Sequence, residues 1–75
     1  MLNLQEMNEG ATGRICMVGG TEQFQRRVTS VGLTPGCRFE IVQNQKKCPI
    51  LLYARNTLLA LDRSDCKNIS VEVVA

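Results

Sequence analysis

Residues 21–36, TEQFQRRVTSVGLTPG, carry the clearest structural signal in the chain. They open with Thr21, a favourable N-cap residue, and Glu22, an acid that suits the positive end of a helix. Three apolar residues then recur at i, i+4 and i+7, the spacing of one helical face: Phe24, Val28 and Val31. This pattern predicts one α-helix over residues 22–31.

The second half of the same stretch predicts how the helix ends. Gly32 stands where a left-handed C-cap is wanted, and Leu33 is placed to fold back on the last turn. Pro35 and Gly36 then suit the second and third positions of a type II turn, because proline presets its φ and glycine accepts a positive φ. We therefore expect a capped helix followed by a tight turn.

Strand-like segments flank this unit on both sides. In residues 37–42, apolar side chains alternate with Arg38 and Glu40, so one face of that segment is expected to be buried. Asn56 and Thr57 are typical of a two-residue hairpin turn, since asparagine tolerates a positive φ. The other segments with strand character are 14–18, 50–55, 58–61 and 69–73.

The order of these segments predicts a mainly-β fold in a single domain over residues 1–75. Asp62 is expected to N-cap a one-turn helix before the last strand, with Asp65 as the reciprocal acid. Near the start, Asn3 and Glu6 resemble a capping box on one short turn. That turn offers two residues to the core, Leu4 and Met7. Short strands with tight turns favour a small closed barrel, because closure removes exposed sheet edges.

Composition narrows the function classes. Nine basic and seven acidic residues give a net charge of +2, and histidine is absent, which removes the commonest general base and metal ligand. Gly19 and Gly20 precede the helix without the Lys-Ser/Thr half of a phosphate-binding loop. The N-terminus lacks the basic and apolar regions of a signal peptide, and no apolar run is long enough to span a membrane. We expect a cytoplasmic, non-enzymatic protein without direct membrane insertion.

The four cysteines are Cys16, Cys37, Cys48 and Cys66. Two disulfides, one four-cysteine metal site and four reduced thiols are the alternatives, and the absence of a Cys-x-x-Cys pair disfavours a zinc site. Cysteines in a protein that is not exported usually act as small core hydrophobes, so we expect reduced thiols and no bound metal or cofactor. Cys48, in a lysine-rich loop, is expected to be the most exposed.

The block 27–36, RVTSVGLTPG, resembles the R-L-x-x-L-G-hydrophobic-x-P-G block of FeoA proteins. Residues 10–15 (GATGRI) resemble the family's strand entry, residues 56–61 (NTLLAL) its G-T-x-L-A-L segment, and Ile69-x-Val71 its closing strand. The resemblance covers nearly the whole chain. Three places depart from the family pattern: Asn56 replaces a glycine, Cys66 replaces a small residue, and the loop 45–48 is polar.

This resemblance implies an SH3-like barrel of about five strands with a helix after the first strand. It also implies a small cytosolic accessory of ferrous iron uptake that binds the cytosolic GTPase part of the membrane transporter FeoB. The alternative is a regulatory or nucleic-acid-binding barrel like the C-terminal domain of DtxR-type metal-dependent repressors. Nucleic acid is not expected as a partner, because the net charge is small and aromatic residues do not interleave the basic ones.

The predicted partner-binding residues lie around the helix. Arg26 and Arg27 are expected to project from it, and Thr34 and Pro35 lie at its exit. Arg27 has a structural alternative, which is to cover the barrel or pair with an acid. The neighbouring apolar residues are expected to belong to the core instead: Val28, Val31 and Leu33.

Overall fold

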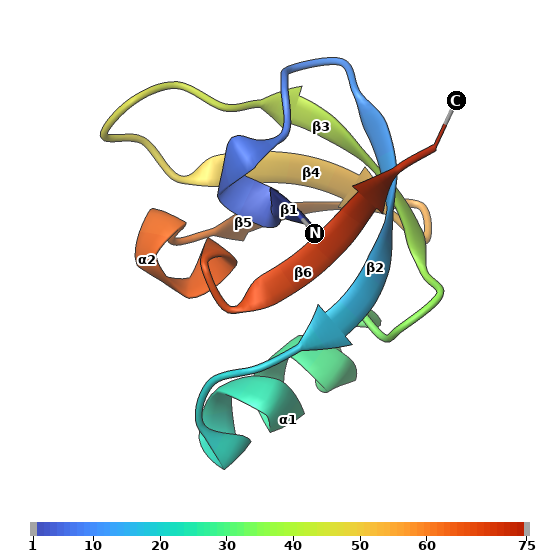
Figure 1. Ribbon diagram of the computed structural model, residues 1–75, viewed down its shortest axis with the longest axis vertical. Coiled ribbons are helices and arrows are strands. Elements are labelled where there is room, and N and C mark those ends of the chain that lie inside the picture. Colours follow the sequence, from blue (N-terminus) through green and yellow to red (C-terminus); the bar gives the residue numbers. More distant parts are fainter. Residues whose placement is uncertain (1, 75) are drawn as a thin grey trace.

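The computed structural model describes residues 2–74, which form one curved antiparallel sheet of six strands with helix α1 below it (Figure 1). The strand order across the sheet is β1-β6-β2-β3-β4-β5. The strands are β1 (Leu2–Asn3), β2 (Thr12–Val18), β3 (Arg38–Gln43), β4 (Ile50–Ala54), β5 (Thr57–Leu61) and β6 (Ile69–Val73). All five predicted strands are present, with ends shifted by up to two residues, and β1 is an addition.

The mainly-β, SH3-like class is confirmed, but the expected closure of the barrel is wrong. Within residues 2–74, β1 pairs only with β6 and β5 only with β4, so the sheet has two edges. β1 is two residues long and runs directly into the 3-10 helix η1 (Leu4–Glu6). It is therefore too short to offer β5 a pairing partner.

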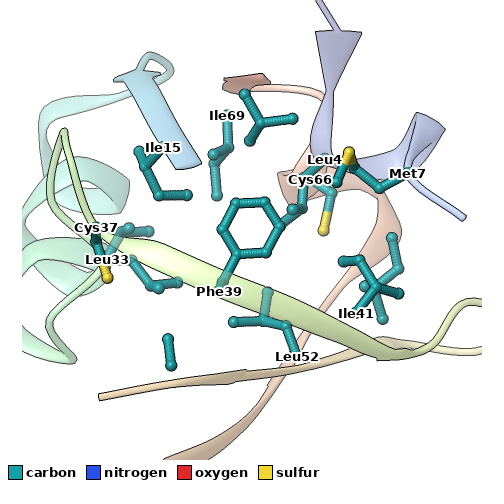
Figure 2. Packing of buried hydrophobic residues seen from close by; sticks show 14 of the residues in the cluster. Leu4, Met7, Ile15, Leu33, Cys37, Phe39, Ile41, Leu52, Cys66 and Ile69 are labelled. Carbon is teal, nitrogen blue, oxygen red and sulfur yellow. The ribbon is translucent and has the colours of Figure 1, made fainter. Parts of the chain in front are cut away.

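The core lies inside the curve of the sheet, with the Phe39 ring at its centre (Figure 2). Leu4 and Met7 are buried there, as predicted. Gly13 of β2 lets the Phe39 ring approach the backbone, because a Cβ at Gly13 would lie 2.6 Å from the ring and 2.9 Å from the Glu72 carbonyl oxygen. Cys37 and Cys66 are buried in the same core, as expected for small hydrophobic side chains.

Helix α1 (Glu22–Ser30) ends one residue before its predicted limit but keeps both predicted caps. The Thr21 hydroxyl accepts a hydrogen bond from the Phe24 N–H at 3.1 Å. At the other end, the Leu33 N–H donates to the Val28 carbonyl at 3.1 Å while Gly32 adopts a φ of 96°. The type II turn also forms, since Gly36 at its third position adopts a φ of 91° and the Cys37 N–H donates to the Thr34 carbonyl at 3.0 Å.

Two local predictions need correction. The turn between β4 and β5 is Arg55–Asn56, one residue earlier than expected, with φ values of 52° and 61° that suit a type I′ hairpin. Asp62 does precede the one-turn helix α2 (Arg63–Cys66), but its side chain makes no cap hydrogen bond. Asp65 is not a reciprocal cap either, because its carboxylate bonds Arg27.

Two side chains hold the loop between β3 and β4 against the N-terminal segment and α2. The Asn44 amide donates to the carbonyls of Gln5 (3.1 Å) and Met7 (2.6 Å) and accepts from the Arg63 guanidinium (2.8 Å). Arg63 also donates to the carbonyls of Gln45 (2.9 Å) and Cys48 (3.3 Å). We call Asn44, Arg63 and these four carbonyl groups the polar clasp.

Candidate functional site

An apolar groove of about 190 Å³ runs between α1 and β5. It is smaller than the cavities of roughly 300–1,000 Å³ that usually hold small ligands, so it suits side chains of a protein partner better than a substrate. We call it the α1–β5 groove. Its lining residues are Phe24, Arg27, Val28, Val31, Leu59, Ala60 and Leu61.

The helical periodicity of α1 builds one wall of the α1–β5 groove. Phe24 and Val28 are buried and join this wall to the core. Val31 was expected in the core, and that prediction is wrong: its side chain is 45% exposed at the groove. The reason is that α1 ends at Ser30, so Val31 is the C-cap residue beyond the last packed turn. The groove therefore has an apolar floor and an accessible apolar rim.

The two helix arginines predicted to bind the partner lie in different surroundings, Arg27 in the groove and Arg26 outside it. Arg27 lines the groove, where its guanidinium donates to the Asp65 carboxylate at 3.0 Å and lies 5.6 Å from the centre of the Phe24 ring. Its structural alternative, pairing with an acid, is therefore realised. Arg26 lies outside the groove and pairs with Glu22, one turn earlier, at 2.9 Å. Both members of that pair are highly exposed, so the pair contributes little to stability.

At the exit of α1, the structure adds a residue that the sequence did not single out. The Arg55 Nε–H donates to the Gly32 carbonyl at 2.7 Å, and its terminal amino group lies 3.4 Å from the Thr34 hydroxyl. Pro35 is exposed beside this contact. Arg55 reaches α1 only because the hairpin turn brings residue 55 there, and no local pattern signals that contact.

The cysteines do not assemble a metal site in the part of the chain that the structure describes. Cys16 and Cys48 are half-buried, whereas Cys37 and Cys66 are buried, so the exposure expected of Cys48 is shared with Cys16. No three His, Cys, Asp or Glu side chains among residues 2–74 are grouped as a metal would need. Burial raises the pKa of the Cys66 thiol to about 12, which keeps it protonated and unreactive at neutral pH.

Three of the nine basic residues are held in ion pairs within residues 2–74. Arg14, Arg26 and Arg27 each pair with a carboxylate, at 3.4, 2.9 and 3.0 Å. Pairing of this kind leaves less positive charge available for phosphate contacts. Across residues 2–74, no helix has the length and apolar character needed to cross a membrane.

Comparison with known proteins places the fold and the family. A FeoA structure matches with a TM-score of 0.91, 22% identity and coverage of 97% of both chains. FeoA of Stenotrophomonas maltophilia, solved with zinc, matches with a TM-score of 0.84 and 21% identity over 96% of this chain and 91% of that one. A manganese-dependent transcriptional repressor matches with a TM-score of 0.89 and 17% identity over 97% of this chain but 41% of its own.

No curated protein sequence matches this chain significantly. The model of the FeoA domain, however, matches residues 2–73, nearly the whole length over which the strands, the capped helix and the groove are built. The chain therefore belongs to the FeoA family.

Proposed function

We propose that this protein is a cytoplasmic accessory of ferrous iron transport that binds the cytosolic GTPase part of a FeoB-type membrane transporter through the α1–β5 groove. Membership of the FeoA family supports the role in ferrous iron transport. For the S. maltophilia FeoA, a role as a ferrous iron transport activating factor has been suggested. The groove is the observation that carries the binding surface, because it leaves apolar side chains accessible beside a structured helix.

The chemistry of the chain supports binding rather than catalysis. Histidine is absent, and the raised pKa of the Cys66 thiol opposes a role as a nucleophile. The FeoA family is one of small accessory domains, and SH3-like barrels commonly serve as interaction modules. The predicted contact residues are proposed accordingly: Arg27 on the groove wall, Thr34 and Pro35 at the exit of α1, and Arg26 on the exposed side of α1 outside the groove.

A test compares two valines of similar exposure. Val31 lies in the groove and is 45% exposed, whereas Val42 lies on β3 outside it and is 48% exposed. Because both side chains already face solvent, glutamine at either position should change stability by about 0.5 kcal/mol or less. Binding to the isolated GTPase domain is measured by calorimetry, with and without guanine nucleotide. We expect Val31→Gln to weaken binding at least about tenfold, as for a residue buried in an interface, and Val42→Gln to leave it unchanged.

The outcomes separate the surface from the function. Equal binding by both variants contradicts the groove as the contact surface. No binding by the unchanged protein, in any nucleotide state, contradicts the proposed partner. A domain that instead binds DNA, with affinity that falls steeply as salt rises, would favour the alternative related to the repressor domain.

A further inference from the structure

Strand β5 is an unusual edge for so small a sheet. Natural edges are shortened or protected by charged residues or proline, because an open edge pairs readily with another chain. The opposite edge, β1, is two residues long, but β5 has five, Thr57–Leu61, and contains no charged residue and no proline. Within residues 2–74, β5 pairs only with β4. Its outer edge is therefore open and chemically suited to pairing.

The hairpin register assigns which backbone groups face that edge. The turn Arg55–Asn56 joins Ala54 to Thr57, and the two residues that flank a two-residue turn form a hydrogen-bonded pair. Hydrogen-bonded and non-hydrogen-bonded pairs then alternate along an antiparallel ladder. The N–H and C=O groups of Leu58 and Ala60 consequently point away from β4. Neither residue takes part in a backbone hydrogen bond to a loop or turn of the described chain.

This edge is also the one that faces the α1–β5 groove. Three consecutive residues, Leu59, Ala60 and Leu61, line the groove. Since neighbouring side chains of a strand point to opposite faces, three in a row mean that the groove runs along the strand's edge rather than over one face. Leu59 and Leu61 pack partly against the core, so a chain that pairs here would direct alternate side chains toward the same apolar wall of α1.

One end of the edge carries a cation without an acidic partner. Arg55, next to the start of β5, is exposed and donates only to a carbonyl and a hydroxyl oxygen of the α1 exit, and no salt bridge within residues 2–74 includes it. By contrast, Arg27 on the groove wall is neutralised by Asp65. A segment that runs antiparallel to β5 ends its course beside Arg55.

We propose that the partner adds an extended segment to β5 as a further antiparallel strand, with apolar side chains opposite Leu59 and Leu61 and an acidic residue at its C-terminal end beside Arg55. The segment pairs with the backbone of Leu58 and Ala60, and its apolar side chains enter the groove. This inference rests on the proposed function for the source of the segment. A second copy of this chain is the other possible source, since its own β5 is followed by Asp62; protection of the Leu58 and Ala60 amides that grows with protein concentration in the absence of any probe would overturn the proposal in its favour.

The test removes one backbone donor. Ala60→Pro deletes the outward N–H, which β4 does not use, so an edge strand should tolerate the change. Ala60→Thr keeps the N–H and is the matched control. Two probes are used: the transporter's GTPase domain, and a synthetic peptide of alternating threonine and valine that ends in aspartate. We expect Ala60→Pro to weaken binding of both probes at least about tenfold relative to Ala60→Thr, which alters the same groove-lining side chain but keeps the N–H.

Hydrogen exchange keeps the proposal testable even if Ala60→Pro fails to fold. In the unchanged protein, bound probe should slow exchange of the Leu58 and Ala60 amides, because those two donors face the edge. If bound probe slows exchange of other amides, such as those of α1, but not of Leu58 and Ala60, the proposal is overturned. That pattern is the one expected of a helix lying in the groove. Replacing the peptide's aspartate with asparagine should weaken binding about two- to fivefold, the range of an exposed ion pair.

The peptide separates this inference from the proposed partner. If the GTPase domain binds but protects neither amide, the strand-addition inference is wrong and the proposed function stands. If the GTPase domain fails to bind while the peptide protects both amides, the edge is a strand receptor and the proposed partner is wrong. If neither probe protects Leu58 and Ala60, the edge does not accept strands.

Discussion

The polar clasp and the α1–β5 groove both lie where segments distant in sequence meet, yet they are built from opposite chemistry. In the clasp, Asn44 and Arg63 make five hydrogen bonds of 3.3 Å or less, one to each other and four to backbone carbonyl groups. In the groove, apolar side chains stay accessible and the edge of β5 has no pairing partner within residues 2–74. Polar groups whose hydrogen bonds are all made within the protein stabilise the fold but have no donors or acceptors left for a ligand. Accessible apolar surface beside unpaired backbone groups adds little to stability but can bind a partner.

This difference assigns stability and partner binding to different parts of the domain. The clasp joins the β3–β4 loop to η1 and α2 without needing a longer core. That leaves α1 and β5 free to present surface instead of burying it against each other. Changes in the clasp should therefore alter stability, and changes in the groove should alter binding.

The largest effect on stability is expected from raising the pH, through Cys66. This residue is fully buried and belongs to α2, the helix that also carries Arg63 of the clasp. Burial raises its pKa from 9.0 to about 12, so above pH 9 the unfolded chain loses a proton that the folded chain keeps. The free energy of unfolding should therefore fall as pH rises from 9 to 12, by up to about 4 kcal/mol from this group. Urea titrations across this pH range, compared with Cys66→Ala, measure it. A parallel loss in both proteins would show that Cys66 is not the cause.

A smaller loss is expected from Asn44→Ala, which deletes the centre of the clasp. The Gln5 and Met7 carbonyls lose their donor and Arg63 loses an acceptor, so the free energy of unfolding should fall by about 2–3 kcal/mol. Gln45→Ala is the control, because Gln45 contributes to the clasp only through its backbone carbonyl. Partner affinity at a temperature where both variants are folded should not change. Weaker binding by folded Asn44→Ala would show that the clasp takes part in binding, and would contradict the separation of stability from binding.

The smallest effect is expected from charge at the groove rim. Arg27→Glu places a like charge beside Asp65 at the groove, whereas Arg26→Glu acts beside Glu22 outside it. Rim charges mainly alter association rates, so Arg27→Glu should slow association severalfold at low salt while Arg26→Glu changes it less. Stopped-flow or surface-plasmon kinetics at two salt concentrations distinguish the variants. A larger effect at Arg26 would move the contact to the outer face of α1.

The fold was largely predictable because its strongest signals are local. The N-cap Thr21, the Gly32 and Leu33 helix end and the Pro35–Gly36 turn depend on neighbours in sequence, and all form as expected. Barrel closure was not predictable in the same way. It depends on whether β1 is long enough to reach β5, which is a property of two segments more than fifty residues apart.

The candidate site was only partly predictable, for the same reason. Helical periodicity predicts the apolar face of α1. It does not predict that Val31 lies beyond the packed turns, or that Asp65 pairs with Arg27. Arg55 has no local signal, since its contact with Gly32 is made by the hairpin. The uncharged run of β5 was a usable signal of an open edge, although an uncharged run alone also suits a buried strand.

The most direct test of the account is a map of the contact surface by NMR. Isotope-labelled protein is titrated with the unlabelled GTPase domain, and amide shifts are followed along the chain. The account predicts that the largest changes fall in α1 and β5, at residues 24–31 and 57–61, while the clasp at Asn44 and Arg63 stays unchanged. Changes centred on the clasp or on the β3–β4 loop, with α1 and β5 unaffected, would contradict it.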